Sequence, residues 1–439
     1  MAIQKEEKSS PEFVKWFSEL DKNSEGIAGG KGANLSEMYN LKIPVPLGFV
    51  VTAQAYDYFI EHAKINEKII ELLSRIDYEN TKKLDDITKQ IRAFILESKF
   101  PKEMEEEIIE AYGNLSANEK DLEESPMTLL NTLQEPQFVA VRSSATAEDS
   151  AEASFAGQGE SFVNVKGNES LLKNIRKCFS SLFTSRSVYY RHKKGFAHDK
   201  MSLAVVVQKM VDSDKSGVIF SKDPSYKNDN IIIEAVWGLG EGIVSGRITP
   251  DKYIVSPEIE ILDKKISNKK VAITRESGGN QIIVKLSDER ANQEVLNNYE
   301  IKTLAEIAVR LEKHYKKPQD IEFAVENKEI YIVQTRPITT IGSRVENKTE
   351  LSGDVILTGL AASPGIASGK IKIIEDLKDL DKINTGDILV TKMTNPDMVV
   401  TMQKAAAIIT DEGGLTAHAS IVSREMGIPC VVGTQEATT

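Results

Sequence analysis

The segment around His418 constrains the fold most, because it predicts a strand, a glycine turn and a helix in immediate succession. The apolar run Ala407–Thr410 comes first, two glycines follow, and an apolar-periodic run over Ala419–Met426 comes directly after the histidine. Glycines let the backbone approach a bound group closely, and the N-terminus of a helix favours negative charge. The pattern is typical of a nucleophilic histidine. A histidine in the core or at the cap of a strand–helix turn is an equally good interpretation of the local pattern.

The chain's 439 residues are enough for two or three domains, each with its own core. Hydrophobic residues make up 41% and charged residues 28%, which is ordinary for a soluble globular protein. The net charge of −11 argues against general binding to nucleic acid or to a membrane surface, since both usually need a basic face. A local basic pocket for an anionic ligand stays compatible with this charge.

The expected location of the chain is the cytoplasm. No apolar run reaches the length of a membrane span, and residues 1–8 are largely charged or polar and lack the apolar core of a signal peptide. The two cysteines, Cys178 and Cys430, are too far apart in the sequence to indicate a metal site or a disulfide framework. We therefore expect a reduced, cytoplasmic protein.

The alternation of helix-like and strand-like periods predicts an α+β or α/β multidomain chain. Residues 53–133 are mainly helical in pattern, and strands dominate from 202 to about 286. Shorter expected elements are a helix over 11–20, a helix from 33 to about 40 after a glycine cluster, a strand near 43–51, strands between 138 and 165, helices over 170–194 and 291–315, and a hairpin of 320–325 and 330–334.

A polar and charged stretch over 341–352 predicts a linker between two bodies of different character. The first body covers 11–340 and the second covers 353–439. In the second body we expect strands near 355–360, 369–374, 388–391, 407–410 and 430–432, and helices near 397–404 and 419–426.

Lys31 lies in a run of glycines, Gly29-Gly30-Lys31-Gly32, before a predicted helix. Backbone N–H groups and an ammonium in this arrangement suit phosphate oxygens. The run does not have the Walker spacing, and a helix cap with a solvated lysine explains it better when it is taken alone.

Arg142 comes near the end of a buried-type strand and is followed by hydroxyl residues, and its planar fork suits phosphate. Residues 154–162 then form a small-residue loop that includes Gly157 and Ser161. This loop could close over phosphates as a lid, or it could be a plain hairpin turn.

Two further apolar strands end in polar or glycine-rich segments. Ala204–Val211 predicts a hinge over Val207–Met210 that offers backbone groups to an adenine edge, although a plain core strand fits equally well. Glu234 ends the other strand, ahead of a glycine-rich turn, and would place a carboxylate and glycine N–H groups near the same site.

The predicted hairpin brings acidic and amide side chains together. The two-residue period puts Asp320 and Glu322 on one face of the first strand, and Gln334 and Arg336 on one face of the second. Hairpin pairing would bring Glu322 near Gln334, with the register left open. A carboxylate and an amide, completed by ATP phosphates, suit Mg²⁺, and Arg336 would neutralise the transferred phosphate. A half-exposed hairpin with surface charges is the alternative.

Six motifs occur in a fixed order: Gly29–Leu35, Val141–Asp149, Ser154–Gln158, Asp320–Phe323, Gln334–Pro337 and Gly413–Ala419. Together they closely resemble the phosphoenolpyruvate synthase (pyruvate, water dikinase) family, from about Pro11 to the last residue. The wider group includes pyruvate phosphate dikinases and rifampin phosphotransferases.

The resemblance implies an ATP-grasp nucleotide-binding domain followed by a β/β/α swivelling phosphohistidine domain. It implies that Lys31, Arg142 and Arg336 bind ATP phosphates and that Glu322 and Gln334 hold Mg²⁺. It also implies that His418 is the histidine that takes phosphate from ATP and later delivers it to pyruvate. The other ATP-site residues that the resemblance implies are Gly157, Ser161, Gln208, Met210, Glu234 and Asp320, with Gln208–Met210 lining the adenine.

The family converts ATP, pyruvate and water to AMP, phosphoenolpyruvate and phosphate, a reaction of pyruvate metabolism and gluconeogenesis. We expect ATP and Mg²⁺ to bind between lobes of 11–340. We expect neutral His418 to attack the β-phosphate, and the linker to act as the hinge that moves the histidine domain. Thr416 matches the threonine that a regulatory kinase/phosphorylase modifies in the family, and a helix N-cap is its everyday alternative.

The sequence departs from the family pattern beyond the histidine. Family members continue into a large (β/α)₈ domain that binds pyruvate, and the swivelling domain usually has further strands after Thr434; neither is in this sequence. This suggests a truncated chain or a split gene product, so we expect competence for the ATP half-reaction only. A homodimer stays open.

Three other functions are alternatives to this interpretation. An antibiotic phosphotransferase related to rifampin phosphotransferase usually carries a large substrate domain where this chain has only a short linker. A nucleotide-sensing or carrier module of a split enzyme would act only with a partner chain. A plain ATP-grasp ligase predicts no role for His418.

Overall fold

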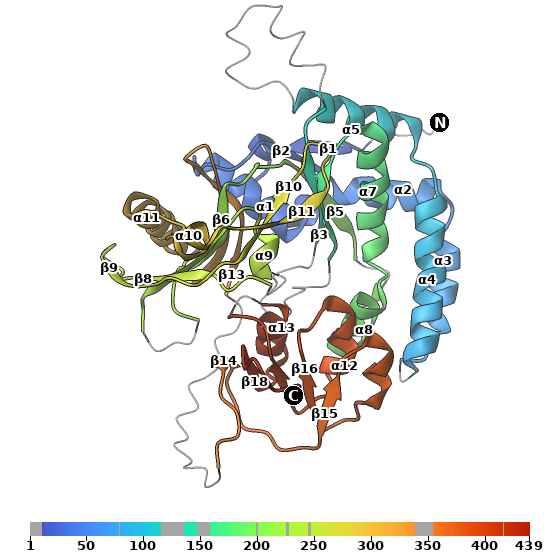
Figure 1. Cartoon of the computed structure of the whole chain (residues 1–439). Helices are drawn as coiled ribbons and strands as arrows, with labels where there is room; N and C mark the ends of the chain where they lie inside the picture. Colours follow the sequence, from blue (N-terminus) through green and yellow to red (C-terminus); the bar gives the residue numbers. More distant parts are fainter. Residues whose placement is uncertain are drawn as a thin grey trace, which may run out of the picture. The chain divides into compact units, whose positions relative to one another are not determined.

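The computed structural model describes residues 11–78, 80–115, 136–146, 159–198, 201–224, 228–244, 247–338, 354–415 and 417–439 (Figure 1). These residues form two compact units. The first comprises the described residues up to Leu41, those between Leu47 and Glu148, and those between Gly159 and Met210. The second comprises Lys42–Pro46 and the described residues from Val211 to Thr439. The predicted linker lies outside the described residues, and the predicted domain boundaries stay a prediction.

The first unit combines one antiparallel sheet with helices. Its strands lie in the order β1-β2-β5-β3-β4. The central strand β5 is apolar along most of its length, and Val205–Val207 are fully buried. The strands are β1 (Val14–Trp16), β2 (Gly48–Val51), β3 (Val139–Ala145), β4 (Ser161–Val165) and β5 (Leu203–Lys209).

The predicted helical character of 53–133 is confirmed for the part that the structure describes. Helices α4 and α7 run side by side (Figure 1), and Phe59, Phe100 and Phe179 meet in one aromatic cluster. The helices of this unit are α1 (Glu25–Asn40), α2 (Ala53–His62), α3 (Asn66–Ser74), α4 (Thr81–Glu97), α5 (Lys102–Asn114), α7 (Asn168–Ser181) and α8 (Ser185–Lys194).

Two expectations near the N-terminus are wrong. Residues 11–20 form β1 and a 3₁₀ turn over Phe17–Glu19 instead of a helix, because Val14–Trp16 pair with β2 and complete the edge of the sheet. Helix α1 begins at Glu25, before the glycine cluster, and the helix is kinked within that cluster at Gly29.

The second unit begins with a six-stranded antiparallel sheet in the order β13-β12-β6-β7-β8-β9, and with a separate β10–β11 hairpin. The strands are β6 (Lys215–Phe220), β7 (Ile231–Trp237), β8 (Asp251–Val255), β9 (Ile261–Lys265), β10 (Val271–Arg275), β11 (Gln281–Lys285), β12 (Gln319–Glu326) and β13 (Glu329–Pro337), and a short helix, α9 (Glu241–Val244), follows β7.

The predicted hairpin at 320–334 is confirmed. Its two-residue turn has positive φ at Asn327 (51°) and Lys328 (70°), as a type I′ turn requires. The pairing is interrupted by a bulge: Ile332 opposes Phe323, whereas Gln334 opposes Glu322, so Val333 is an extra residue.

The predicted helix over 291–315 is split into α10 (Asp288–Asn292) and α11 (Asn298–Tyr315). Between them, the backbone N–H groups of Val295 and Leu296 donate to Asp251 and Tyr253 of β8 instead of to a helix. Asn297 then caps α11 and forms a capping box with Glu300.

The C-terminal part of the second unit has its own sheet in the order β14-β18-β17-β16-β15, in which β15 to β18 are parallel. The strands are β14 (Leu360–Ser363), β15 (Ile371–Ile374), β16 (Ile388–Thr391), β17 (Ala407–Thr410) and β18 (Cys430–Val432), and the helices are α12 (Val399–Met402) and α13 (His418–Met426). Three predicted strands match the observed ones, but the strand expected at 355–360 is wrong, because pairing with β18 begins only at Leu360.

None of the helices in the described ranges combines the length and the apolar character needed to cross a membrane.

Candidate active site

Helix α1 presents Lys31 just after a sharp kink. Gly29 has φ 65° and ψ 172°, a backbone conformation that is open almost only to glycine. The hydroxyl of Ser144 accepts from the N–H of Gly32 at 3.1 Å and donates to the carbonyl of Ala28 at 2.7 Å. Two of the predicted motifs, the glycine cluster and the strand segment after Arg142, are therefore held together by one buried side chain.

Arg142, Ser161 and Gln208 lie on one face of the sheet in the first unit. Arg142 of β3 is the cross-strand partner of Ser161 on β4 and of Val206 on β5, and Gln208 lies two residues beyond Val206. Gly32 of α1 packs over the same face, since a Cβ placed there would meet the side chains of Val50 and Val206. The structure thus brings the helix that carries Lys31 onto the face that carries Arg142, Ser161 and Gln208.

In the predicted hinge around Gln208, the backbone N–H groups of the next two residues are already hydrogen-bonded, so the candidate donor to a nucleotide is the Gln208 side chain. The N–H of Lys209 donates to the carbonyl of Leu47, and that of Met210 donates to the carbonyl of Phe138. The Gln208 side chain is 2% exposed, and its Nε2 has no hydrogen-bond partner among the described residues. A buried amide donor of this kind is costly unless a ligand or water accepts from it, which supports the predicted nucleotide contact.

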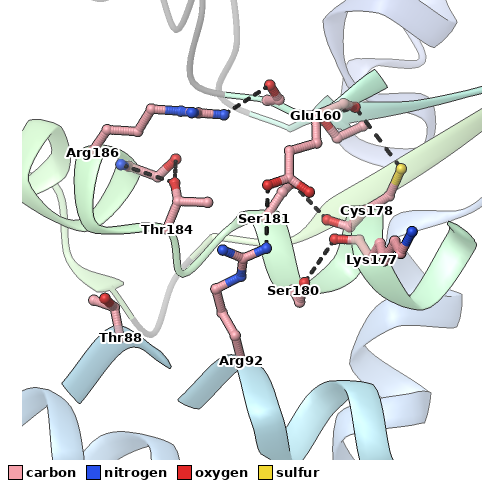
Figure 2. A network of polar contacts seen from close by, with 12 residues as sticks. Thr88, Arg92, Glu160, Lys177, Cys178, Ser180, Ser181, Thr184 and Arg186 are labelled. Carbon is pink, nitrogen blue, oxygen red and sulfur yellow. Dashed lines mark hydrogen bonds and ion pairs between the residues drawn. The ribbon is translucent and has the colours of Figure 1, made fainter. Parts of the chain in front are cut away.

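The start of β4 is held by a polar network around Glu160. Arg92 of α4 donates to the Glu160 carboxylate at 3.2 Å, and the Cys178 thiol lies 3.9 Å from its carbonyl (Figure 2). Ser143 accepts from the Glu160 N–H at 2.9 Å. Burial, followed by the nearby Glu160 charge, raises the pKa of Cys178 well above its ordinary value, so this thiol stays protonated. These contacts fix the strand that bears Ser161.

In the second unit, one row of side chains crosses four adjacent strands. Gln334 of β13 opposes Glu322 of β12, Glu322 opposes Val218 of β6, and Val218 opposes Glu234 of β7. Cross-strand partners share a face, so the predicted carboxylates and the amide lie on one side of this sheet. The register that the sequence left open is the one that brings Glu322 and Gln334 together.

Asp320 and Arg336 are cross-strand partners next to this row. The guanidinium donates from Nε at 3.0 Å and from Nη2 at 2.8 Å to the same Asp320 oxygen. Burial, the largest single effect, would by itself lower the pKa of Arg336, but the charges of Asp320, Glu425 and Glu322, together with the hydrogen bonds to Asp320, outweigh burial and raise the pKa above its ordinary value. Arg336 is therefore a fixed, permanently charged group, and Asp320 is the residue that orients it.

A carboxylate and an amide oxygen facing each other across two strands are the kind of oxygen donors that Mg²⁺ takes. Glu322 and Gln334 fit that chemistry as a partial ligand set, which phosphate oxygens of a bound nucleotide would complete. Their role as metal ligands stays a prediction.

His418 is the first residue of α13 and is half-buried. Its Nδ1 lies 2.9 Å from the hydroxyl of Thr394, which is 4% exposed. Thr394 follows β16 and His418 follows β17, and because these strands are parallel neighbours, the segments after them meet at one edge of the sheet. Gly413 starts the intervening turn with φ 113°.

Four predicted features fall wholly or mostly outside the described residues: Gly157, the rest of the predicted lid loop over 154–162 up to residue 158, Thr416, and the linker over 341–352. Helix α13 has Ala417 at its N-cap, without a side-chain cap hydrogen bond. Both interpretations of Thr416 stay predictions.

Sequence reasoning missed Thr394 and Ser144. A hydroxyl residue shortly after the predicted strand at 388–391 was a partial signal for Thr394, although the parallel pairing that brings it to His418 was not predicted. For Ser144, the sequence showed hydroxyls after Arg142 but not which segment they would bind.

Comparisons with known proteins identify the family of this chain. The family model for the AMP/ATP-binding domain of pyruvate phosphate dikinase matches residues 25–353, and the model for the mobile domain of PEP-utilising enzymes matches residues 383–439. A probable phosphoenolpyruvate synthase of Archaeoglobus fulgidus is 49% identical over 434 residues. A probable phosphoenolpyruvate synthase of Methanothermobacter thermautotrophicus is 46% identical over 427 residues, and the phosphoenolpyruvate synthase of Pyrococcus furiosus is 45% identical over 471 residues.

Each of these matches covers 97% of this chain. The chain in turn spans 55%, 60% and 56% of the three relatives' own lengths. The resemblance inferred from six motifs is confirmed by matches that run through both predicted bodies. The chain belongs to the family of phosphoenolpyruvate synthases and pyruvate phosphate dikinases.

Proposed function

We propose that this chain transfers phosphate from ATP to His418, as the first half of a phosphoenolpyruvate synthase reaction. The contact between Thr394 Oγ1 and His418 Nδ1 carries this proposal. In the neutral tautomer whose Nδ1–H donates to Thr394, the lone pair is on Nε2, which makes Nε2 the attacking nitrogen.

In the proposed step, a bond forms between Nε2 of His418 and the β-phosphorus of ATP. The bond from that phosphorus to the oxygen it shares with the α-phosphate breaks, and AMP leaves with the electron pair. The histidine then carries the β- and γ-phosphates, and hydrolysis between them releases phosphate and leaves phosphohistidine. The ring keeps its Nδ1 proton at Thr394 throughout.

Charge and position are the main contributions of proteins to phosphoryl transfer. Lys31, Arg142 and Arg336 are the residues that we propose for the phosphates, and Glu322 and Gln334 would hold Mg²⁺, which would neutralise charge on the phosphate oxygens. The Gln208 side chain, whose Nε2 has no hydrogen-bond partner among the described residues, would contact the base. Asp320 acts by holding Arg336, with which it makes two hydrogen bonds.

The final phosphate acceptor is proposed from the relatives. Their name, phosphoenolpyruvate synthase, supports pyruvate rather than a rifamycin. Because the chain spans little more than half of their length, we propose that it completes the ATP half-reaction by itself and needs further residues for transfer to pyruvate. Regulation at Thr416, a homodimer and a cytoplasmic location stay predictions.

The test uses the purified chain with Mg²⁺ and ATP labelled in the β-phosphate. Acid-labile label should remain on the protein, should be lost in a His418→Ala variant and should persist in a His62→Ala variant, since His62 is the exposed end of α2. Label retained by His418→Ala would refute the assignment. Release of AMP, measured in parallel, separates attack at the β-phosphorus from attack at the γ-phosphorus.

A further inference from the structure

The hydroxyl of Ser144 occupies the place of a helix hydrogen bond. In an unbroken α-helix, the N–H of Gly32 would donate to the carbonyl of Ala28, four residues earlier. Here Ser144 accepts from that N–H at 3.1 Å and donates to that carbonyl at 2.7 Å. A side chain inserted into the hydrogen-bond ladder is a recognised cause of a helix kink, and it comes from a strand that is over a hundred residues away in sequence.

Gly29 and Ser144 fit each other closely. A Cβ on Gly29 would lie 2.2 Å from the Ser144 carbonyl oxygen and 2.4 Å from its hydroxyl. Ser144 is 0% exposed, so no bulk water competes for its two hydrogen bonds. The kinked segment from Ala28 to Gly32, which contains Lys31, is therefore fixed against β3 at both of its ends.

Ser144 lies two residues after Arg142 and on the same face of β3. Strand β3 thus carries Arg142, one predicted phosphate-binding cation, and through Ser144 it also anchors the segment that carries Lys31, the other. We propose that Ser144 is a positioning residue that sets the place of Lys31 relative to Arg142. This inference rests on the proposed function, in which both cations bind the phosphates of ATP.

Ser143 provides a matched control. It is the preceding residue on the same strand and is also buried, at 2% exposure. Its hydroxyl accepts from the N–H of Glu160, just before the neighbouring strand β4, at 2.9 Å and donates to the Glu160 carbonyl at 3.1 Å, rather than bonding the backbone of α1. Removal of this hydroxyl disturbs a buried serine of β3 without touching the segment that carries Lys31.

The test is a double-mutant cycle on nucleotide affinity. The dissociation constant of α,β-methylene-ATP with Mg²⁺ is measured by calorimetry for the wild-type chain, for Ser144→Ala, for Lys31→Met and for the double variant. Ser144→Ala should weaken binding about tenfold in the wild-type background and less than about twofold in the Lys31→Met background. Ser143→Ala should change the constant by the same factor in both backgrounds.

Equal factors for Ser144→Ala in the two backgrounds would overturn the positioning role while leaving nucleotide binding intact. If the wild-type chain binds no nucleotide, or if Lys31→Met has no effect on affinity, the proposed function fails at this site and the inference fails with it. Circular dichroism checks that each variant is folded. Should Ser144→Ala not fold, Ser144→Cys, which keeps a weak donor and acceptor, must show the same dependence on Lys31.

Discussion

Thr394 Oγ1 lies 2.9 Å from Nδ1 of His418, although the two residues are 24 positions apart and follow different strands. In the tautomer whose Nδ1–H donates to Thr394, the contact orients the ring and Nε2 carries the lone pair that the proposed phosphorylation requires. We expect Thr394→Val, which keeps the shape and removes the hydroxyl, to slow phosphorylation of His418 about tenfold, the effect of one lost hydrogen bond.

The measurement is a single-turnover time course with labelled ATP. Thr394→Ser keeps the hydroxyl and should stay within about threefold of the wild-type rate. An unchanged rate in Thr394→Val would show that the ring is oriented by other contacts.

Gly29 should be intolerant of any side chain. Gly29→Ala introduces a Cβ 2.2 Å from the Ser144 carbonyl oxygen at a backbone conformation that costs about 1–3 kcal/mol for other residues. Its thermal unfolding temperature should therefore fall. Gly26→Ala is the control, because it lies in the same helix with no atom within 4 Å of the added Cβ and should be neutral or stabilising by up to about 1 kcal/mol. Equal effects of the two substitutions would contradict the kink at Gly29.

The ion pair of Lys269 and Asp251 is fully buried, with both side chains 0% exposed. Lys269→Met leaves an unpaired buried carboxylate and should reduce the free energy of unfolding by about 3–5 kcal/mol. Lys264, which pairs with Glu294 near the surface, is the matched lysine, and Lys264→Met should cost less than about 1 kcal/mol. Urea unfolding of the two variants checks the difference; similar midpoints would refute it.

Glu322 and Gln334 should control the response to Mg²⁺. Glu322→Gln removes the charged oxygen ligand, so the Mg²⁺ concentration that half-saturates His418 phosphorylation should rise by about tenfold or more. Glu326→Gln, at the turn end of the same strand, is the control and should leave this concentration unchanged. Phosphorylation that is insensitive to chelation would rule out the metal site altogether.

Burial raises the pKa of Cys430 from its ordinary value of 9.0 to about 11. The unfolded chain loses this proton first, so the stability linked to Cys430 is present below about pH 9 and is lost as the pH rises toward about 11. The total loss is about 3 kcal/mol at most. Unfolding free energies of wild type and Cys430→Ala, compared over this range, should converge as the pH rises. A constant difference between the two would exclude the linkage.

Local patterns were sufficient for strands whose apolar runs are bounded by turn residues. The strands at 388–391, 407–410 and 430–432 and the hairpin turn at Asn327 were all predictable in this way. Elements whose geometry depends on a distant partner were not. Strand β1 exists because it pairs with β2, where Val14 opposes Val51, and the kink at Gly29 depends on Ser144.

The same distinction holds for the candidate site: local features were predictable from the sequence, and those that depend on a distant segment were not. The two-residue period of a strand is enough to place Asp320 and Glu322 on one face. The position of Glu234 in the same row requires the order of strands in the sheet, in which β6 lies between β12 and β7. The contact of Thr394 with His418 depends on β16 and β17 being parallel neighbours, which their separate sequences do not specify.

The bulge at Val333 determines on which face of β13 the side chains of Gln334 and Arg336 lie. Without a bulge, the two-residue period would put Gln334 and Arg336 on the side of Ile330 and Ile332, toward the core. Because the bulge reverses the alternation, the strand is apolar on the core side before Val333 and polar on the opposite side after it. Deletion of Val333 would restore regular pairing and keep Gln334 opposite Glu322. Insertion of a further residue would either turn the Gln334 side chain toward the core or shift it out of register with Glu322. Strand β13 should therefore tolerate shortening at this point better than lengthening.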